Sequence, residues 1–221
     1  GRTAHGAVNL AESMTVSSDV YYYRIADKFW NRQGEFGQTP IQDVAAEFGI
    51  GAKTGVELPG ENRGRLPTPQ QRREAYEARP DLFNNGDWRA GDNINMSIGQ
   101  GDVLATPLQL ADAYSTFANG GTRYQPQVVT RVTRTLDATK PPGELGNYEL
   151  VRQIEPTVQG TVAMDPAHYQ KLWSGFLGVT QNAAGTAAAP FAASPTAWPM
   201  AGKTGTAQVN KKADTALFVG W

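Results

Sequence analysis

The C-terminal end of the chain constrains the fold most, because it holds two strand-like segments joined by a short polar stretch. The segments "MAGKTGTAQV" (200–209) and "TALFVGW" (215–221) flank the polar "NKKAD" (210–214), which predicts an antiparallel hairpin. Because strand side chains alternate between faces, Thr204 and Thr206 would share one face and Gly205 would point to the other. Two hydroxyls beside Lys203 can hold a carboxylate, and a residue without a side chain lets another element pack close behind the strand.

Helical patterns occupy much of the remaining chain. The segments "AVNLAESMTV" and "VYYYRIADKFW" predict two helices around a polar break at 17–19, where Asp19 would cap the second helix. Further helices are predicted at 41–48, at 107–118 after an N-cap at Thr106, and from Pro166 onward. The segment "YQPQVVTRVTRTL" (124–136) alternates like a strand. The chain therefore combines helices with antiparallel strands.

Two long segments lack a clear period. Pro, Gly, Asn and Arg replace the apolar pattern from 56 to 102, and the Ala- and Pro-rich stretch 183–199 is predicted to be a loop. A loop as long as 56–102 is uncommon inside a compact domain, so we expect it to be shaped for function or packed over another lobe. Its polar run at 93–100 is expected to satisfy backbone groups around a site, in preference to contacting a substrate.

The charge balance and the missing cysteines exclude several functions. The 221 residues include 20 basic and 21 acidic side chains, without a basic block that would neutralise phosphates, so we expect no nucleic-acid partner. The absence of cysteine excludes disulfides, thiolate metal sites and a cysteine nucleophile, and neither a metal nor a cofactor is expected. No apolar run is long enough to span a membrane, and the N-terminus lacks a signal-peptide layout, so any anchor would lie outside this chain.

The triplet Lys-Thr-Gly occurs twice, and its surroundings distinguish the two copies. Lys53–Gly55 follows a predicted helix end and runs into "VELPGE", where a turn is the simplest interpretation. Lys203–Gly205 lies inside a predicted strand, where it could take part in binding a carboxylate. The alternative interpretation is an ordinary hairpin with an exposed lysine. A phosphate-binding loop ending in Gly202-Lys203-Thr204 would need a glycine where Ala197 stands, so that interpretation fails.

Four segments in order resemble a known family. The segments are "HGAVNL…VSSDVYYY", "FGIGAKTGVELPGENRGRLPTP", "NMSIGQGDVLATPLQLADAYSTFANGG" and "AGKTGTAQ". Together they are similar to the transpeptidase domain of class B penicillin-binding proteins, most closely the elongation-type members, over residues 5–221. The resemblance implies an α/β (α+β) domain of the penicillin-recognising serine acyl-transferase fold, with an antiparallel sheet flanked by helices and a helical lobe that bears Ser17.

Three motifs characterise that family: a Ser-x-x-Lys nucleophile, a Ser-x-Asn or Ser-x-Asp, and Lys-Thr-Gly. By resemblance, Ser17 and Asp19 form the second motif and residues 203–205 the third. Asp stands where many relatives have Asn; this is frequent in the elongation-type group, but an ionised Asp19 is a poorer hydrogen-bond donor. Ser17 and Lys203 would lie close together and pass a proton to the departing amine.

The resemblance further implies a D,D-transpeptidase that cross-links peptidoglycan stem peptides through an acyl-serine. Thr204 and Thr206 would bind the terminal carboxylate of the donor peptide, and the backbone N–H of Thr206 would form one arm of the oxyanion hole. β-Lactam antibiotics would trap the serine as a stable ester. The whole protein would work in cell-wall synthesis on the outer face of the cytoplasmic membrane.

The chain departs from the family because its nucleophile motif is absent. No serine is followed by lysine three positions on; the serines are at 13, 17, 18, 97, 115, 174 and 194. In relatives that motif precedes the Ser-x-Asp motif, and only sixteen residues precede Ser17 here. We therefore expect residues 1–221 to be the C-terminal part of a single transpeptidase domain, truncated at both ends. An upstream segment of the same protein would carry the nucleophile, and the fragment alone would be inactive.

Other functions remain as alternatives at this point. A Ser–His pair is the usual rival for activating a serine. His168 sits beside Asp165 in a predicted first helical turn, so a solvated or capping role is expected for it, and His5 lies near a glycine, so it is expected to be structural. A related β-lactamase or D,D-carboxypeptidase would deacylate with water. A binding module would either sense β-lactams without turnover or dock to a membrane glycosyltransferase.

Overall fold

The computed structural model describes residues 4–82, 85–194, 199–208 and 213–221. Along these ranges, nine helices and six strands follow in order: α1 (Leu10–Thr15), α2 (Asp19–Asn31), α3 (Gln33–Phe36), α4 (Pro40–Glu47), α5 (Pro69–Ala78), α6 (Ala90–Met96), α7 (Pro107–Ala118), β1 (Thr122–Tyr124), β2 (Arg131–Thr135), β3 (Tyr148–Gln153), β4 (Val158–Thr161), α8 (Pro166–Gln181), α9 (Ala188–Ala192), β5 (Gly202–Ala207) and β6 (Thr215–Gly220).

The strands form antiparallel pairs. In the described part of the chain there are three two-stranded sheets, β1 with β4, β2 with β3 and β5 with β6, so the expected single sheet is here divided. The predicted C-terminal hairpin is confirmed as β5 and β6; residues 209–212, most of its predicted turn, lie outside the described residues. The strand expected at 124–136 is divided into the end of β1 and β2, with irregular chain between them.

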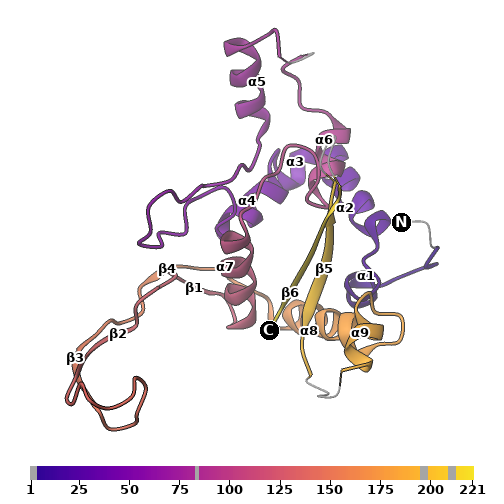
Figure 1. Ribbon diagram of the computed structural model, residues 1–221. Coiled ribbons are helices and arrows are strands. Elements are labelled where there is room, and N and C mark those ends of the chain that lie inside the picture. The colour runs from indigo at the N-terminus through magenta and orange to yellow at the C-terminus, as the bar shows by residue number, and fades with distance from the viewer. Residues whose placement is uncertain (1–3, 83–84, 195–198, 209–212) are drawn as a thin grey trace.

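An aromatic core joins α7, α8 and the end of the hairpin. Phe117, Phe176 and Ala201 are buried, and the indole of Trp221 lies 5.0 Å from the ring of Phe176 and 5.5 Å from that of Tyr114 between ring centroids. Aromatic rings bury large apolar areas, and the Phe176–Trp221 pair has the edge-to-face arrangement that such rings favour. The C-terminal hairpin is thereby fixed against α8, and Figure 1 shows both elements side by side.

Helix α1 packs against α8 through two glycines of α8. A Cβ added to Gly175 would lie 2.8 Å from the backbone oxygen of Ala11, and one added to Gly178 would overlap the side chain of Thr15. The Thr15 hydroxyl donates to the carbonyl oxygen of Gly175 at 3.1 Å. The absence of side chains at these two positions therefore sets the distance between α1 and α8. It also sets the position in space of the C-terminal end of α1.

Several sequence expectations need correction in the described residues. The stretch 56–102 contains α5 and α6, and the loop predicted at 183–199 contains α9. The N-cap of α2 is Ser18, and Asp19 is the first helical residue. An acidic side chain in the first turn is stabilised by the positive end of the helix dipole, so Asp19 suits this position as well as the cap.

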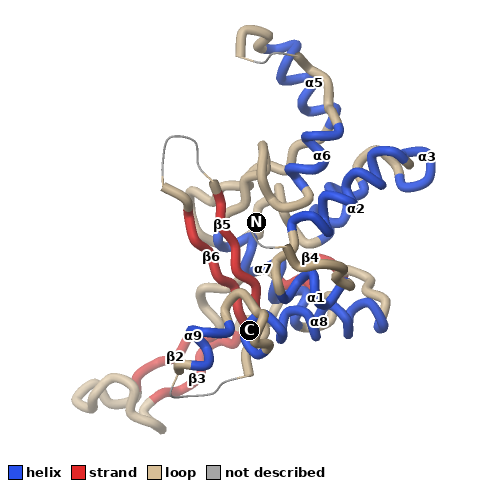
Figure 2. The backbone as a smooth tube through the Cα atoms, turned by 90° about the vertical axis from the view of Figure 1, so that its right-hand side faces the viewer, coloured by secondary structure: helices blue, strands red, loops and turns tan. Residues whose placement is uncertain are grey.

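Two parts project from the body. Figure 1 shows the β2–β3 hairpin extending away from α7, and Figure 2 shows α5 projecting outward beyond α6. All residues of β2 and β3 are exposed. Among the described residues, no helix has both the length and the apolarity needed to cross a membrane.

Candidate active site

The pairing of β5 with β6 determines which backbone groups of β5 face outward. Ala201 and Trp221 exchange both backbone hydrogen bonds, at 3.0 and 2.9 Å, just before the strands begin. Hydrogen-bonded pairs alternate along an antiparallel ladder, so residues 203 and 205 bond to β6. The N–H and C=O groups of Thr204 and Thr206 consequently point to the opposite edge of β5, away from β6. This outward edge of β5 is where an extended peptide could pair.

Ser17 lies in the turn between α1 and α2, in an unusual backbone conformation. The amide of Ser18 donates to the carbonyl of Ser13 at 2.9 Å, and the amide of Ser17 donates to that of Met14 at 3.3 Å. This is a Schellman-type helix ending, in which the residue at the position of Ser17 is most often glycine. Ser17 has a φ of +53°, which costs a non-glycine residue about 1–2 kcal/mol. Such strain is found at functional sites, where a particular side chain is needed.

Lys203 joins the hairpin to this turn. Its Nζ donates to the Ser17 hydroxyl oxygen at 2.8 Å and to the Thr204 carbonyl oxygen at 2.9 Å. These residues are 186 positions apart in sequence, and the core and the α1–α8 contact bring them together. The predicted proximity of Ser17 and Lys203 is thus present in the structure.

Burial and a nearby carboxylate act on Lys203 in opposite directions. Burial lowers the pKa of the Lys203 ammonium below its ordinary value, and the negative charge of Asp19 partly opposes this. A lowered lysine pKa eases release of a proton to an acceptor held beside it. Asp19 therefore lies near enough to influence Lys203 by charge, a role that does not need the donor group of asparagine.

The hydroxyls of β5 have different surroundings. The Thr204 hydroxyl lies 2.6 Å from the Thr186 hydroxyl, and the side chain of Thr206 is exposed. The carbonyl oxygen of Thr206 accepts a hydrogen bond from Gln100 Nε2 at 3.2 Å. The Thr206 N–H shares the outward edge of β5, which suits the expected oxyanion-hole donor.

Gly205 does not have the expected close neighbour. A Cβ built at Gly205 would lie 3.6 Å from the nearest atom, the Cβ of Leu217, which is ordinary contact. The close approach occurs at Gly202 instead, where an added Cβ would lie 2.6 Å from the ring of Phe218. The sequence therefore predicted the close approach at Gly205, three residues after Gly202, where the structure has it.

The other Lys-Thr-Gly lies in irregular chain that connects α4 to α5, which agrees with the predicted structural role. Thr54 is buried, and its hydroxyl donates to a carboxylate oxygen of Glu61 at 2.6 Å. Hydrogen bonds from Thr54 lower the pKa of the Glu61 carboxyl group. Gly55 has a φ of +78°, and Lys53 is exposed. Because its hydroxyl is already bonded to Glu61, Thr54 is a packing residue.

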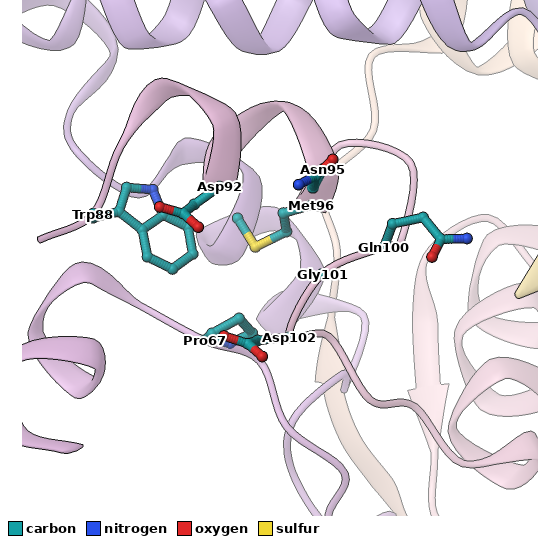
Figure 3. A pocket seen from close by; sticks show the side chains of 8 residues that line it. All are labelled: Pro67, Trp88, Asp92, Asn95, Met96, Gln100, Gly101 and Asp102. Atoms are coloured by element: carbon teal, nitrogen blue, oxygen red, sulfur yellow. The ribbon is translucent and has the colours of Figure 1, made fainter. Parts of the chain in front are cut away.

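The polar run at 93–100 satisfies backbone groups, as expected. Asn93 Nδ2 donates to the Ala26 carbonyl at 3.0 Å, the Ser97 hydroxyl donates to that of Ile94 at 2.7 Å, and Gln100 reaches Thr206. Figure 3 shows a small pocket beside α6, whose lining side chains include Trp88, Asp92, Asn95, Met96, Gln100 and Asp102. Arg72 lies 3.5 Å from Asp92 and 3.4 Å from Asp102, so a cation of the chain itself faces the acidic side chains of this pocket.

Neither histidine lies in this site. His168 sits in the first turn of α8, 3.6 Å from the N-cap carboxylate of Asp165, and both side chains are exposed. His5 is exposed near the N-terminus. Among the described residues, no group of three or more His, Asp or Glu side chains could hold a metal ion.

Sequence reasoning missed Thr186. It lies just before α9 in the stretch predicted to be a loop, where alanine, glycine and threonine alternate without a period. No local pattern indicates which threonine of such a stretch faces another strand. The contact with Thr204 depends on tertiary structure and could be found only from coordinates.

The structure thus brings together a lysine on an antiparallel strand, a serine in a strained turn beside it, and strand amides that face outward. The chain belongs to the family of the penicillin-binding protein transpeptidase domain, whose family model matches residues 2–221. The fold class and the predicted relationship are thereby confirmed.

Individual relatives agree with this family. The chain is 30% identical to the peptidoglycan D,D-transpeptidase MrdA of Haemophilus influenzae, in an alignment that covers 97% of this chain and 29% of the relative. It is 35% identical to MrdA of Acinetobacter baumannii, in an alignment that covers 63% of this chain and 18% of the relative. It thus spans less than a third of either relative. The MrdA relatives place it with the elongation-type class B members.

Solved structures give the same result. All of this chain aligns with 42% of Pseudomonas aeruginosa PBP2 in complex with WCK 5153, at a TM-score of 0.75 and 28% identity. It also aligns over its full length with 34% of PBP2 from Helicobacter pylori in its complex with MreC, at a TM-score of 0.70 and 27% identity.

Proposed function

We propose that this chain is the part of a D,D-transpeptidase domain that binds the donor stem peptide and handles the proton, and that the whole protein cross-links peptidoglycan. The hydrogen bond from Lys203 to Ser17 is the observation that carries the proposal. The family relationship supports it, since relatives with the name D,D-transpeptidase match the chain.

The nucleophile in this proposal is a serine from a segment N-terminal to residue 1. Its oxygen attacks the carbonyl carbon between the two terminal D-alanines of the donor, which forms an ester and breaks the C–N bond, while the lysine of the same upstream Ser-x-x-Lys motif takes the proton of the serine hydroxyl. The Ser17 hydroxyl gives its proton to the leaving amine nitrogen, and Lys203, already donating to Ser17, restores that proton. An acceptor amine then attacks the ester carbon, which forms the cross-link and breaks the ester bond. The amine gives one proton back to Lys203 through Ser17, and the upstream lysine returns its proton to the released serine oxygen.

The donor peptide would pair with the outward edge of β5. The developing oxyanion would accept a hydrogen bond from the Thr206 N–H, and the donor carboxylate would accept from the hydroxyls of Thr204 and Thr206. A β-lactam presents a carbonyl and a carboxylate in a similar arrangement, so the same groups would bind it. The resulting ester would persist where no acceptor amine reaches it.

The remaining assignments concern the whole protein. We place it on the outer face of the cytoplasmic membrane, with its anchor outside residues 1–221. The complex of Helicobacter pylori PBP2 with MreC supports assembly with a partner protein. Docking of the whole protein to a membrane glycosyltransferase, given above as an alternative function, would be compatible with the transpeptidase reaction.

Product analysis tests the proposed reaction. We define the extended chain as residues 1–221 together with the segments that its gene encodes immediately upstream and downstream. Incubated with a stem pentapeptide that carries an acceptor amine, the extended chain should release one D-alanine for each peptide dimer, both measured by mass spectrometry. D-Alanine without dimer would identify a carboxypeptidase, and penicillin labelling without D-alanine release would identify a sensor. Either result would contradict the transpeptidase assignment.

A further inference from the structure

The segment that connects α8 to α9 is held rigidly on α8, and it places one hydroxyl against β5. The Gly185 amide donates to the Asn182 carbonyl at 2.7 Å, and the Ala187 amide donates to that of Val179 at 2.9 Å. A Cβ on Gly185 would overlap the carbonyl oxygen of Gly178. Ala187 is buried, with 4% of its surface exposed. Thr186, between these two anchored neighbours, therefore has little freedom to move.

Thr186 contacts both halves of the candidate site. Its backbone amide donates to the carbonyl of Thr15 at 3.3 Å, two residues before Ser17. Its hydroxyl oxygen lies 2.6 Å from the Thr204 hydroxyl oxygen. Helix α9, which follows the segment, packs on the Thr204 face of the hairpin, where the ring of Phe191 lies 5.5 Å from that of Phe218, the residue opposite Thr204.

We propose that Thr186 is a positioning residue for carboxylate recognition, which orients the Thr204 hydroxyl toward the donor carboxylate. This inference rests on the proposed function. A hydroxyl has one proton to donate and two lone pairs. When Thr186 donates its proton to the Thr204 oxygen, the Thr204 proton is free to point at a bound carboxylate. A hydroxyl that accepts one hydrogen bond also donates a stronger one.

The exposure of Thr186 agrees with this role. Its side chain is exposed, so its hydroxyl is not needed to satisfy a buried group. Replacing threonine by valine keeps the shape and the β-branch and removes only the hydroxyl, whereas serine keeps the hydroxyl. A matched control is Thr133→Val, the same change at an exposed position of the projecting β2 strand.

The test uses the extended chain and two ligands that differ only at the carboxylate, benzylpenicillin and its methyl ester. The rate constant for formation of the penicilloyl adduct is measured for each by mass spectrometry. Thr186→Val should lower the rate constant for the acid by about tenfold, the size of one hydrogen bond to a charged group. It should leave the ester within about twofold of wild type, because the ester lacks the charge that Thr204 recognises. Thr186→Ser should retain most of the wild-type rate constant for the acid, and Thr133→Val should change the rate constant for neither ligand.

The outcomes separate this inference from the proposed function. An equal loss for acid and ester would assign Thr186 a merely structural role, and an unchanged rate for the acid would remove it from carboxylate recognition. Either result overturns the inference and leaves the transpeptidase assignment in place. Failure of the wild-type extended chain to react with either ligand would overturn both.

Discussion

Replacing Lys203 by alanine in the extended chain should lower the rate of acylation by benzylpenicillin by about 100- to 10,000-fold, the range for loss of a positioned proton-transfer group. Lys203 is half-buried and donates to Ser17 at 2.8 Å. Without it, Ser17 loses the ammonium group that would replace the proton given to the leaving nitrogen. The measurement is the rate constant for penicilloyl adduct formation, determined from intact mass against time.

The chain offers a matched control for this substitution. Lys53 begins the other Lys-Thr-Gly triplet, but it is exposed and its Thr54 is bonded to Glu61. Lys53→Ala should therefore leave the acylation rate within about twofold of wild type, since surface substitutions away from special features have small effects. Equal losses for the two variants would mean that the structural distinction between the triplets has no chemical consequence.

Substituting Gly175 by valine should lower the free energy of unfolding by about 3 kcal/mol, the upper part of the range for overpacking a tight contact. The new side chain would meet the Ala11 backbone and the Cβ of Met14, each 2.8 Å from the added Cβ. Because α1 leads into the turn at Ser17, displacing it should also reduce acylation. Urea unfolding followed by circular dichroism gives the free energy of unfolding.

The control for helix propensity is the same change at Gly91. That glycine lies in α6, and a Cβ there meets nothing within 4 Å. Gly91→Val should change stability by no more than about 0.5 kcal/mol, as expected for an open surface position. If Gly175→Val were as stable as Gly91→Val, the α1–α8 contact would not depend on glycine, and our account of how Ser17 is positioned would be wrong.

The sequence predicted those features that depend on local pattern. The apolar period and the N-cap indicated α7 with the correct ends, and the alternation around Lys203 indicated the hairpin. The Pro- and Gly-rich surroundings of Lys53 correctly indicated a connection outside the helices and strands, although the chain there is irregular. The pairing of Ser17 with Lys203 came from family resemblance, because no local pattern joins residues at opposite ends of the chain.

What the sequence could not indicate depends on contacts between distant segments. Helix α5 has a mostly charged and polar sequence, so it lacks the apolar period that reveals a helix. The requirement for glycine at 175 and 202 appears only when the neighbours of each are known. Thr186 illustrates the same limit, since its partner Thr204 lies 18 residues further along the chain on another element.

The most direct test of the central claim is the intact mass of residues 1–221 and of the extended chain after incubation with benzylpenicillin. Our account predicts one penicilloyl adduct on the extended chain, attached to a serine upstream of residue 1, and none on residues 1–221 alone. An adduct on a serine within 1–221, with Ser17 the first to examine by peptide mapping, would contradict the assignment of Ser17 and Lys203 as proton-handling partners of an upstream nucleophile.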